Sequence, residues 1–96
     1  MAEQIRRLVL DTLKPIDPSI IEFATALSAL DGIIAVNISI VEIDRKVENA
    51  KITIEGDNIE FKTVVETIAD LGGSVHSIDE VVAGKMIIDD AATLQD

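Results

Sequence analysis

The sequence contains no cysteine, tryptophan or tyrosine, and its only aromatic residues are Phe23 and Phe61. Without cysteine there can be no disulfide framework, no thiolate nucleophile and no cysteine-based zinc or iron–sulfur site. A protein that stacks bases or sugars on aromatic rings would lack its platform. These absences argue against thiol chemistry and against RNA binding of the RRM type.

Positive charge is also scarce, because 8 Lys and Arg stand against 18 Asp and Glu, giving a net charge of -10. Phosphate backbones and anionic membranes repel such a chain. No apolar run approaches the ~20 residues that span a bilayer, and the N-terminus is charged where a signal peptide would be apolar. We expect a cytoplasmic protein with neither nucleic acid nor a membrane as its partner.

The 96 residues, of which 48% are apolar, suffice for one small core. Four segments have the alternation or the β-branched content of strands: residues 5–13, 33–43, 50–56 and 72–84. In the second of these, IIAVNISIVEI, one face is expected to carry Ile34, Val36, Ile38 and Ile40.

Two amphipathic helices are expected between these strands. The first follows Asp17-Pro18, where Asp17 has the chemistry of an N-cap and Pro18 suits the first helical position. The second follows Asp57 and Glu60, which have the spacing of a capping box. The element order is therefore βαββαβ. It predicts an α+β, ferredoxin-like sandwich, with an antiparallel sheet of order 4-1-3-2 and both helices on one face.

We expect one domain over residues 1–96, with residues 85–96 as a C-terminal arm or tail. The fourth strand contains the only histidine, in the stretch GGSVHSIDEVVAG. If Ser74 lies near Leu13, two complementary cross-strand pairs result: His76 opposite Asp11, and Glu80 opposite Arg7. These are either ordinary salt links on the uncovered sheet face or a polar platform that binds a ligand through His76, Asp11 and Arg7.

Two further site hypotheses come from the same face. A small hydrolase could use His76 to activate Ser74 or Ser77, with Asp11 orienting the imidazole, although no nucleophile elbow is present. A hard cation such as Ca²⁺ could bind between subunits, because such ions prefer several oxygen ligands. The candidate ligands are Asp11, Glu42, Asp44, Asp79 and Glu80. The alternative for these acids is a solvated surface.

A homo-oligomer is favoured by the edges of the predicted sheet. Residues 33–43 would form an edge strand without proline, lysine or glycine, so their free backbone groups could pair with another chain. In the first strand Ile5, Val9 and Leu13 would point away from the helices and need a cover. A neighbouring subunit, or the arm at Met86 to Ile88 of one, would supply it. The alternative is a mostly polar face with scattered apolar residues.

Three stretches, LVLDTLKP, VNISIVEID and above all GGSVHSIDEVVAG, resemble the small archaeal family catalogued as domain of unknown function number 211. The resemblance covers nearly the whole chain. It implies a ferredoxin-like subunit of a ring-shaped homo-oligomer, with no established activity and no catalytic residue to carry over. It also implies binding of divalent cations such as calcium. The family's characteristic residues here include Asp11, Pro15, Asn37, Glu42, Asp44, Gly72, Gly73, His76, Ser77, Asp79, Glu80 and Gly84.

Overall fold

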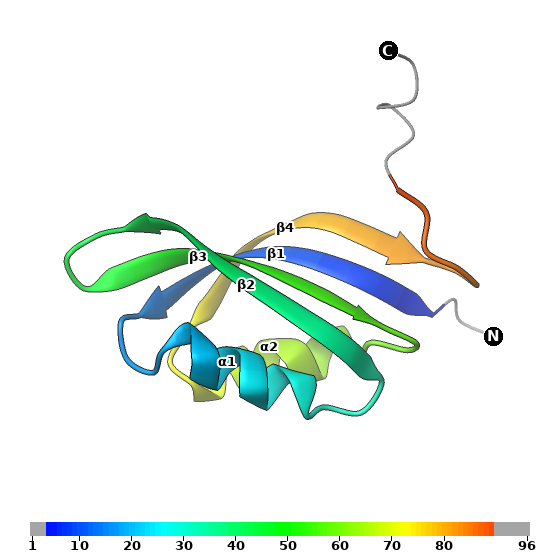
Figure 1. The fold of residues 1–96 in the computed structure, drawn as a ribbon, viewed down its shortest axis with the longest axis horizontal. Coiled ribbons are helices and arrows are strands. Elements are labelled where there is room, and N and C mark those ends of the chain that lie inside the picture. The colour runs from blue at the N-terminus through cyan, green and yellow to red at the C-terminus, as the bar shows by residue number, and fades with distance from the viewer. Residues whose placement is uncertain (1–3, 90–96) are drawn as a thin grey trace, which may run out of the picture.

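Four strands and two helices follow one another in the expected order. The structure is a computed structural model, and it describes residues 4–89. The elements are β1 (Ile5–Pro15), α1 (Ile20–Ser28), β2 (Ile33–Ile43), β3 (Val47–Gly56), α2 (Phe61–Asp70) and β4 (Ser74–Ala83). The strands form one antiparallel sheet in the order β2-β3-β1-β4 (Figure 1). This confirms the ferredoxin-like α+β fold.

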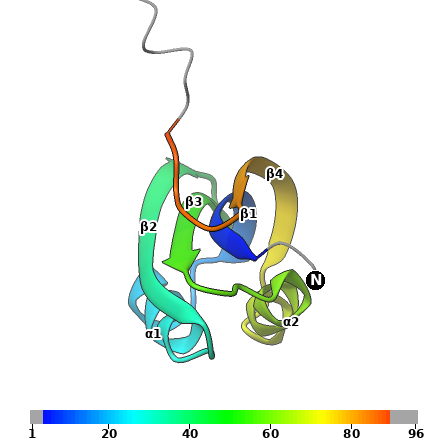
Figure 2. The same cartoon turned by 90° about the vertical axis from the view of Figure 1, so that its right-hand side faces the viewer.

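Both helices cover one face of the sheet, here called the inner face, and the opposite, outer face carries no helix (Figure 2). The core lies between the helices and the inner face. Alternate residues of β1 and β3 enter it because successive strand side chains point to opposite faces. Its buried members are Leu8, Leu10, Phe23, Leu27, Ile52, Ile54, Ile59, Val64 and Ile68. Among residues 4–89, no helix is long and apolar enough to cross a membrane.

The first helix begins later than predicted. Ser19, not Asp17, is the N-cap residue of α1, which starts at Ile20. The Ser19 N–H donates a hydrogen bond to Glu22 Oε1 at 3.2 Å. Ser19 and Glu22 therefore have the capping-box arrangement that ties the first turn together. Asp17 and Pro18 lie in the preceding loop, so their predicted roles are wrong.

The second helix is also capped differently, because Glu60 is its N-cap residue. Asp57 instead accepts a hydrogen bond from Arg6 at 3.1 Å. The Ile59 N–H donates to the carbonyl oxygen of Ile5 at 3.0 Å, which holds the segment before α2 beside β1. The predicted capping box of Asp57 and Glu60 is therefore wrong. Asp57 instead links the segment before α2 to β1.

Bulges change which side chains share a face. In β2, Ile33 pairs with Gly56 and Ala35 with Glu55, so Ile34 is an extra residue. Ile33 packs against the core together with Val36 and Ile38, whereas Ile34 is 70% exposed, so Ile34 does not share their face as predicted. In β1 a register shift falls between Ile5 and Arg7, and Ile5 packs on the core rather than outward. One extra residue reverses the alternation on one side of it.

The predicted register of β4 is right at one end and wrong further on. Ser74 lies opposite Leu13, as expected. His76 and Asp79 are then the extra residues of two bulges, so Ser77 lies opposite Asp11 and Glu80 lies opposite Val9. The predicted pairings of His76 with Asp11 and of Glu80 with Arg7 are therefore wrong as backbone register. Each bulge moves the following residues by one position.

The part of the predicted arm that the structure describes, residues 85–89, lies on the side of the sheet away from the helices (Figures 1 and 2). Asp89 reaches Arg7 of β1, at 3.3 Å between Oδ1 and Nη1. On the outer face of β1, Val9 is buried, whereas Leu13 is exposed. The arm of the same chain thus approaches the face for which a cover was expected. Residues 90–96 of the predicted arm lie outside the described residues.

Candidate functional site

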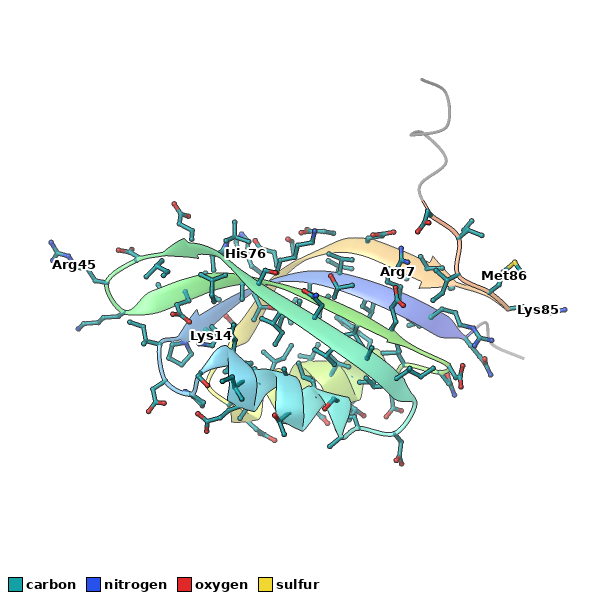
Figure 3. The ribbon with its side chains drawn as sticks, in the orientation of Figure 1. Arg7, Lys14, Arg45, His76, Lys85 and Met86 are labelled. Carbon is teal, nitrogen blue, oxygen red and sulfur yellow. The ribbon has the colours of Figure 1, made fainter. Side chains whose placement is uncertain are left out.

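The outer face is hollowed near the turn between β2 and β3. This hairpin-end hollow has a volume of about 260 Å³ and is lined by Asp11, Leu13, Glu42, Asp44, Val47, Asn49 and His76. All four strands contribute residues to it. His76 lies on the side of the sheet away from the helices (Figure 3). The hollow therefore unites four residues that the sequence predicted as site residues.

The hairpin-end hollow is lined by both acidic and apolar side chains. Three carboxylates and one imidazole share its lining with the side chains of Leu13 and Val47. Within residues 4–89, however, no group of three or more His, Cys, Asp and Glu side chains is arranged so that it could hold a metal ion. The carboxylates of a single chain can attract a cation here, but they do not form a coordination sphere.

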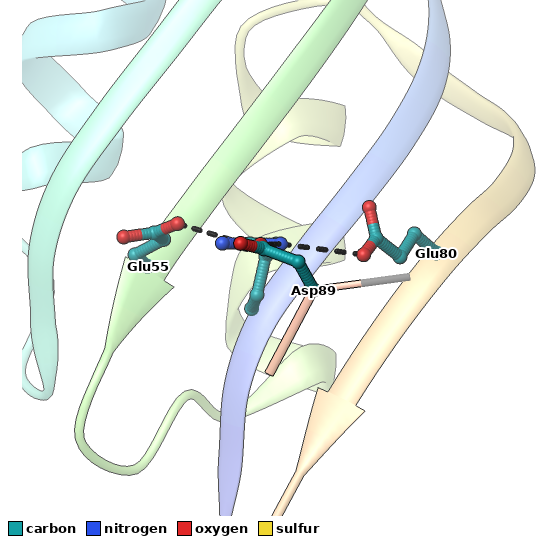
Figure 4. Close-up of polar contacts among 4 residues, drawn as sticks. Glu55, Glu80 and Asp89 are labelled. Carbon is teal, nitrogen blue, oxygen red and sulfur yellow. Dashed lines mark hydrogen bonds and ion pairs between the residues drawn. The ribbon is translucent and has the colours of Figure 1, made fainter. Parts of the chain in front are cut away.

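A second cluster surrounds Arg7, farther along β1. Its Nε donates to Glu55 Oε2 at 2.8 Å, and its Nη1 lies 3.3 Å from Glu80 Oε2 and 3.3 Å from Asp89 Oδ1 (Figure 4). These carboxylates come from β3, β4 and the arm, so the guanidinium links three segments. The hydrogen bond with Glu55 raises the pKa of Arg7, and burial opposes that rise. Arg7 is therefore a permanent cation on the outer face.

Glu80 reaches Arg7 although the two residues are not opposite one another. Glu80 pairs with Val9, and Arg7 pairs with Val82. Long side chains span the diagonal between neighbouring strands, so the predicted ion pair forms in spite of the wrong register. Asp79, the bulged neighbour, accepts a hydrogen bond from Ser77 Oγ at 2.7 Å.

The predicted site residues thus fall into two places. The ligand hypothesis is divided, with His76 and Asp11 in the hairpin-end hollow and Arg7 in the ion cluster. The cation hypothesis is divided as well. Asp11, Glu42 and Asp44 line the hollow, whereas Asp79 and Glu80 line a separate groove beside β4.

The hydrolase hypothesis requires a relay from Ser74 or Ser77 through His76 to Asp11. His76 and Ser74 are exposed, and the Ser77 hydroxyl donates a hydrogen bond to Asp79. Among the side chains of residues 4–89, no hydrogen bond joins His76 to either serine or to Asp11. An exposed imidazole without an orienting partner is not set up as a general base. The hydrolase stays the alternative prediction.

One important polar group was missed in the sequence. The Lys14 side chain is fully buried, and its Nζ donates to the carbonyl of Pro15 at 2.6 Å and to Glu48 Oε1 at 2.7 Å. It also lies 5.2 Å from the centre of the Phe23 ring. The signal was the period of two that places Lys14 on the same face as Leu8 and Leu10.

Comparison with known proteins gives a family but no activity. The family model DUF211, described as uncharacterized ArCR, matches residues 6–96. An uncharacterized protein of Methanocaldococcus jannaschii is 54% identical over 92 residues, which cover 96% of this chain and 95% of that protein. Neither description names a substrate, a ligand or a partner, so function must be argued from the geometry.

Proposed function

The chain belongs to the DUF211 family of uncharacterized proteins, and from its geometry we propose that it is the subunit of a ring-like homo-oligomer joined through the free edges of its sheet. The observation that carries this proposal is the pair of long edge strands, β2 and β4. Each presents unpaired backbone N–H and C=O groups along the side that has no neighbouring strand in the sheet. Proline and lysine, with which monomeric proteins commonly protect such edges, are absent from both strands, although each strand carries the bulges described above.

The two edges also expose apolar side chains. Ile34, Val41 and Ile43 are exposed on β2, and Ile78 and Val81 are about half exposed on β4. Covering these apolar side chains with a neighbouring strand is favourable, because it removes apolar surface from water. This pattern supports an interface that joins β2 of one copy to β4 of the next.

Strand direction allows this joint without a break in the sheet. Every neighbouring pair within the sheet is antiparallel, so β2 and β4 run in opposite directions. Placing β4 of one copy beside β2 of another therefore continues the antiparallel pattern. Such an interface joins two different surfaces, and repetition closes a ring when the rotation between copies permits it.

Charge favours an edge joint over packing of two outer faces. The outer face carries the acids Asp11, Glu42, Glu55, Glu80 and Asp89 against the cations Arg7 and Lys51, so its charge is negative and two such faces would repel one another. By contrast, residues 33–41 of β2 contain no charged side chain. The edge is the part of the sheet at which a second acidic copy can approach with the least repulsion.

Native mass spectrometry tests the assembly directly. The unaltered chain is expected as a discrete oligomer, and the double variant Ile34→Lys/Val41→Lys as a monomer, because two ammonium groups would have to be buried at the joint. Ile21→Lys is the matched control, since Ile21 is 73% exposed on α1 and belongs to neither edge strand. A monomeric unaltered chain, or an oligomer that survives the edge lysines, would refute the edge joint.

A second candidate function is binding of Ca²⁺ at the joint between subunits. Its support is the position of two neighbouring carboxylates, Asp79 and Glu80, on the edge strand β4. Ca²⁺ takes six to eight oxygen ligands, so a site on this edge needs oxygens from a second copy. In the proposed joint the end of β2 lies beside the start of β4, so Glu42 and Asp44 are remote from Asp79 and Glu80, and the added oxygens must come from other groups of the second copy.

Calcium binding can be separated from assembly with a charge-neutral variant. Asp79→Asn/Glu80→Gln is expected to lose bound Ca²⁺ in isothermal titration calorimetry, because amides are weaker ligands than carboxylates for a hard cation. Glu66→Gln, an exposed acid on α2, is the control. Unchanged affinity in the double variant would exclude Asp79 and Glu80 as ligands.

A further inference from the structure

Cross-strand rows of paired residues run through all four strands, so each row has one end on the β2 edge and the other on the β4 edge. Successive rows alternate between the two faces of the sheet, because successive strand side chains do. One outer-face row consists of Ser39, Lys51, Asp11 and Ser77, and two inner-face rows consist of Ile38, Ile52, Leu10 and Ile78 and of Val36, Ile54, Leu8 and Val81. When β2 of a second copy lies beside β4, the register of the joint decides which row ends meet.

The inner-face rows end in apolar side chains that a single chain covers incompletely. On β4, Ile78 is 49% exposed and Val81 is 51% exposed. On β2, Ile38 and Val36 are only partly buried against the core. If the rows continue from one copy into the next, the β4 pair meets the β2 pair in the same order, which removes apolar surface from water. A shift of one residue would set polar β2 side chains of the outer face against the β4 pair instead, so the inner face favours continuous rows.

On the outer face, continuous rows also bring complementary polar groups together. The row that begins at Glu42 ends at Ser74, two residues before His76, so Glu42 of one copy lies beside the His76 segment of the next. His76 is exposed on the outer face, and as a bulged residue it stands between two rows (Figure 3). Side chains on such a diagonal reach one another. Farther along, the row that begins at Asn37 ends at Glu80, so an amide meets a carboxylate.

Charge distinguishes this register from those shifted by two residues. A shift in one direction would move Glu42 towards Asp79, where two carboxylates repel, and a shift in the other direction would move Glu42 past the start of β4. The charged groups beside His76 in its own chain are Asp11, Glu42 and Asp44 of the hairpin-end hollow, Lys51 opposite Asp11, and Asp79 of β4. Glu42 of the second copy would add a carboxylate on the open side of β4.

We propose that the edge joint has one register, in which each cross-strand row of one copy continues into the next and His76 of β4 lies beside Glu42 of the neighbouring β2. This inference rests on the proposed edge joint and specifies which residues meet in it. It gives the exposed imidazole of the only histidine an anionic neighbour in the second copy.

Because the chain lacks cysteine, paired substitutions can measure the register. Ser39 and Ser77 lie on opposite edges of one sheet, three strand spacings of ~4.8 Å apart, so Ser39→Cys/Ser77→Cys can form disulfides only between copies. We expect a ladder of covalent oligomers, at a yield about fivefold above that of Ser39→Cys/Ser74→Cys, because Ser74 ends a different row. Non-reducing gel electrophoresis measures the yield. Equal yields, or a higher yield from Ser39→Cys/Ser74→Cys, would overturn the register.

The pH dependence of assembly tests the contact between His76 and Glu42. Imidazole changes its charge between pH 5 and 8, and a carboxylate across the joint favours its protonated form in the assembled state. The concentration at which the oligomer dissociates should therefore be about threefold lower at about pH 5.5 than at about pH 8, the effect of one cross-strand ion pair. Sedimentation velocity measures it. His76→Gln and Glu42→Gln should each remove this difference, whereas Glu66→Gln, at an exposed position of α2, should keep it.

The outcomes separate the register from the joint itself. A pH difference of equal size in all three variants would overturn the contact between His76 and Glu42. An oligomer that dissociates with the edge lysines but shows no preferred cross-link would reject the register and retain the edge joint. A monomeric unaltered chain would reject both.

Discussion

Lys14 shows how one charged side chain can hold two segments together in a small core. Its Nζ has no exposure, and its partners are Glu48 of β3 and the backbone carbonyl of Pro15 at the end of β1. Glu48 is itself only 16% exposed. Removing either charge would leave the other poorly hydrated, which is more damaging than the loss of a surface ion pair.

We therefore predict that Lys14→Ala lowers the free energy of unfolding by about 3–5 kcal/mol, because it leaves the Glu48 carboxylate without its ion-pair partner and opens a cavity beside Phe23. Lys14→Met/Glu48→Leu should recover most of that loss, since it removes both charges and restores the volume. Urea unfolding followed by far-ultraviolet circular dichroism measures both, as the chain has no Trp or Tyr. Lys62→Ala, on exposed α2 surface, is the control; an equal loss there would contradict the role of Lys14.

At the scale of elements, bulges decide which side chains each strand directs to the outer face. The extra residues of β4 are His76 and Asp79, which the sequence had singled out for their chemistry. Bulges re-aim side chains and bend the strand that carries them. His76 lines the hairpin-end hollow and Asp79 lines the groove beside β4, so two bulges on one edge strand supply a residue to each depression.

Close contact between β3 and the start of β2 gives a prediction at this scale. A Cβ atom added at Gly56 would lie 2.0 Å from the carbonyl oxygen of Gly32, a backbone atom. Gly56→Ala should therefore lower the free energy of unfolding by about 2 kcal/mol or more, because the two strands must separate locally. Urea unfolding measures it. Ser39→Ala, at an exposed position of β2, should change stability by less than about 0.5 kcal/mol. A similar small effect at Gly56 would contradict the close approach.

For the whole molecule, the net charge of -10 opposes any association of identical copies. The proposed edge pairing would have to overcome this repulsion with backbone hydrogen bonds and apolar contacts. Assembly should therefore strengthen as salt screens the charge, in contrast to an assembly that depends mainly on ion pairs.

We predict that the concentration at which the oligomer dissociates falls as NaCl rises from about 0.01 M to about 1 M, where the Debye length shrinks from about 30 Å to about 3 Å. Sedimentation velocity at several protein concentrations measures it. Sodium sulfate at equal ionic strength serves as a control, because an effect of ionic strength should be common to both salts. Dissociation on adding salt would show that ion pairs dominate the interface.

The sequence by itself determined the elements and their order. The β-branched run of residues 33–43, the helical spacing after residue 20 and the glycines near residue 72 are local signals, and each acts within a few residues. The right-handed connection of two βαβ units then leaves few topologies, so the sheet order followed as well.

Only the tertiary structure decided which side chains meet. The bulges at Ile34, His76 and Asp79 are not visible as breaks in the alternation, because each depends on how two distant strands fit their twist and their turns. A shift of one residue in register moves a side chain to the opposite face. For that reason the sequence identified the acids, the histidine and the arginine of the outer face, while their division between the hairpin-end hollow and the Arg7 cluster arose from pairing across the sheet.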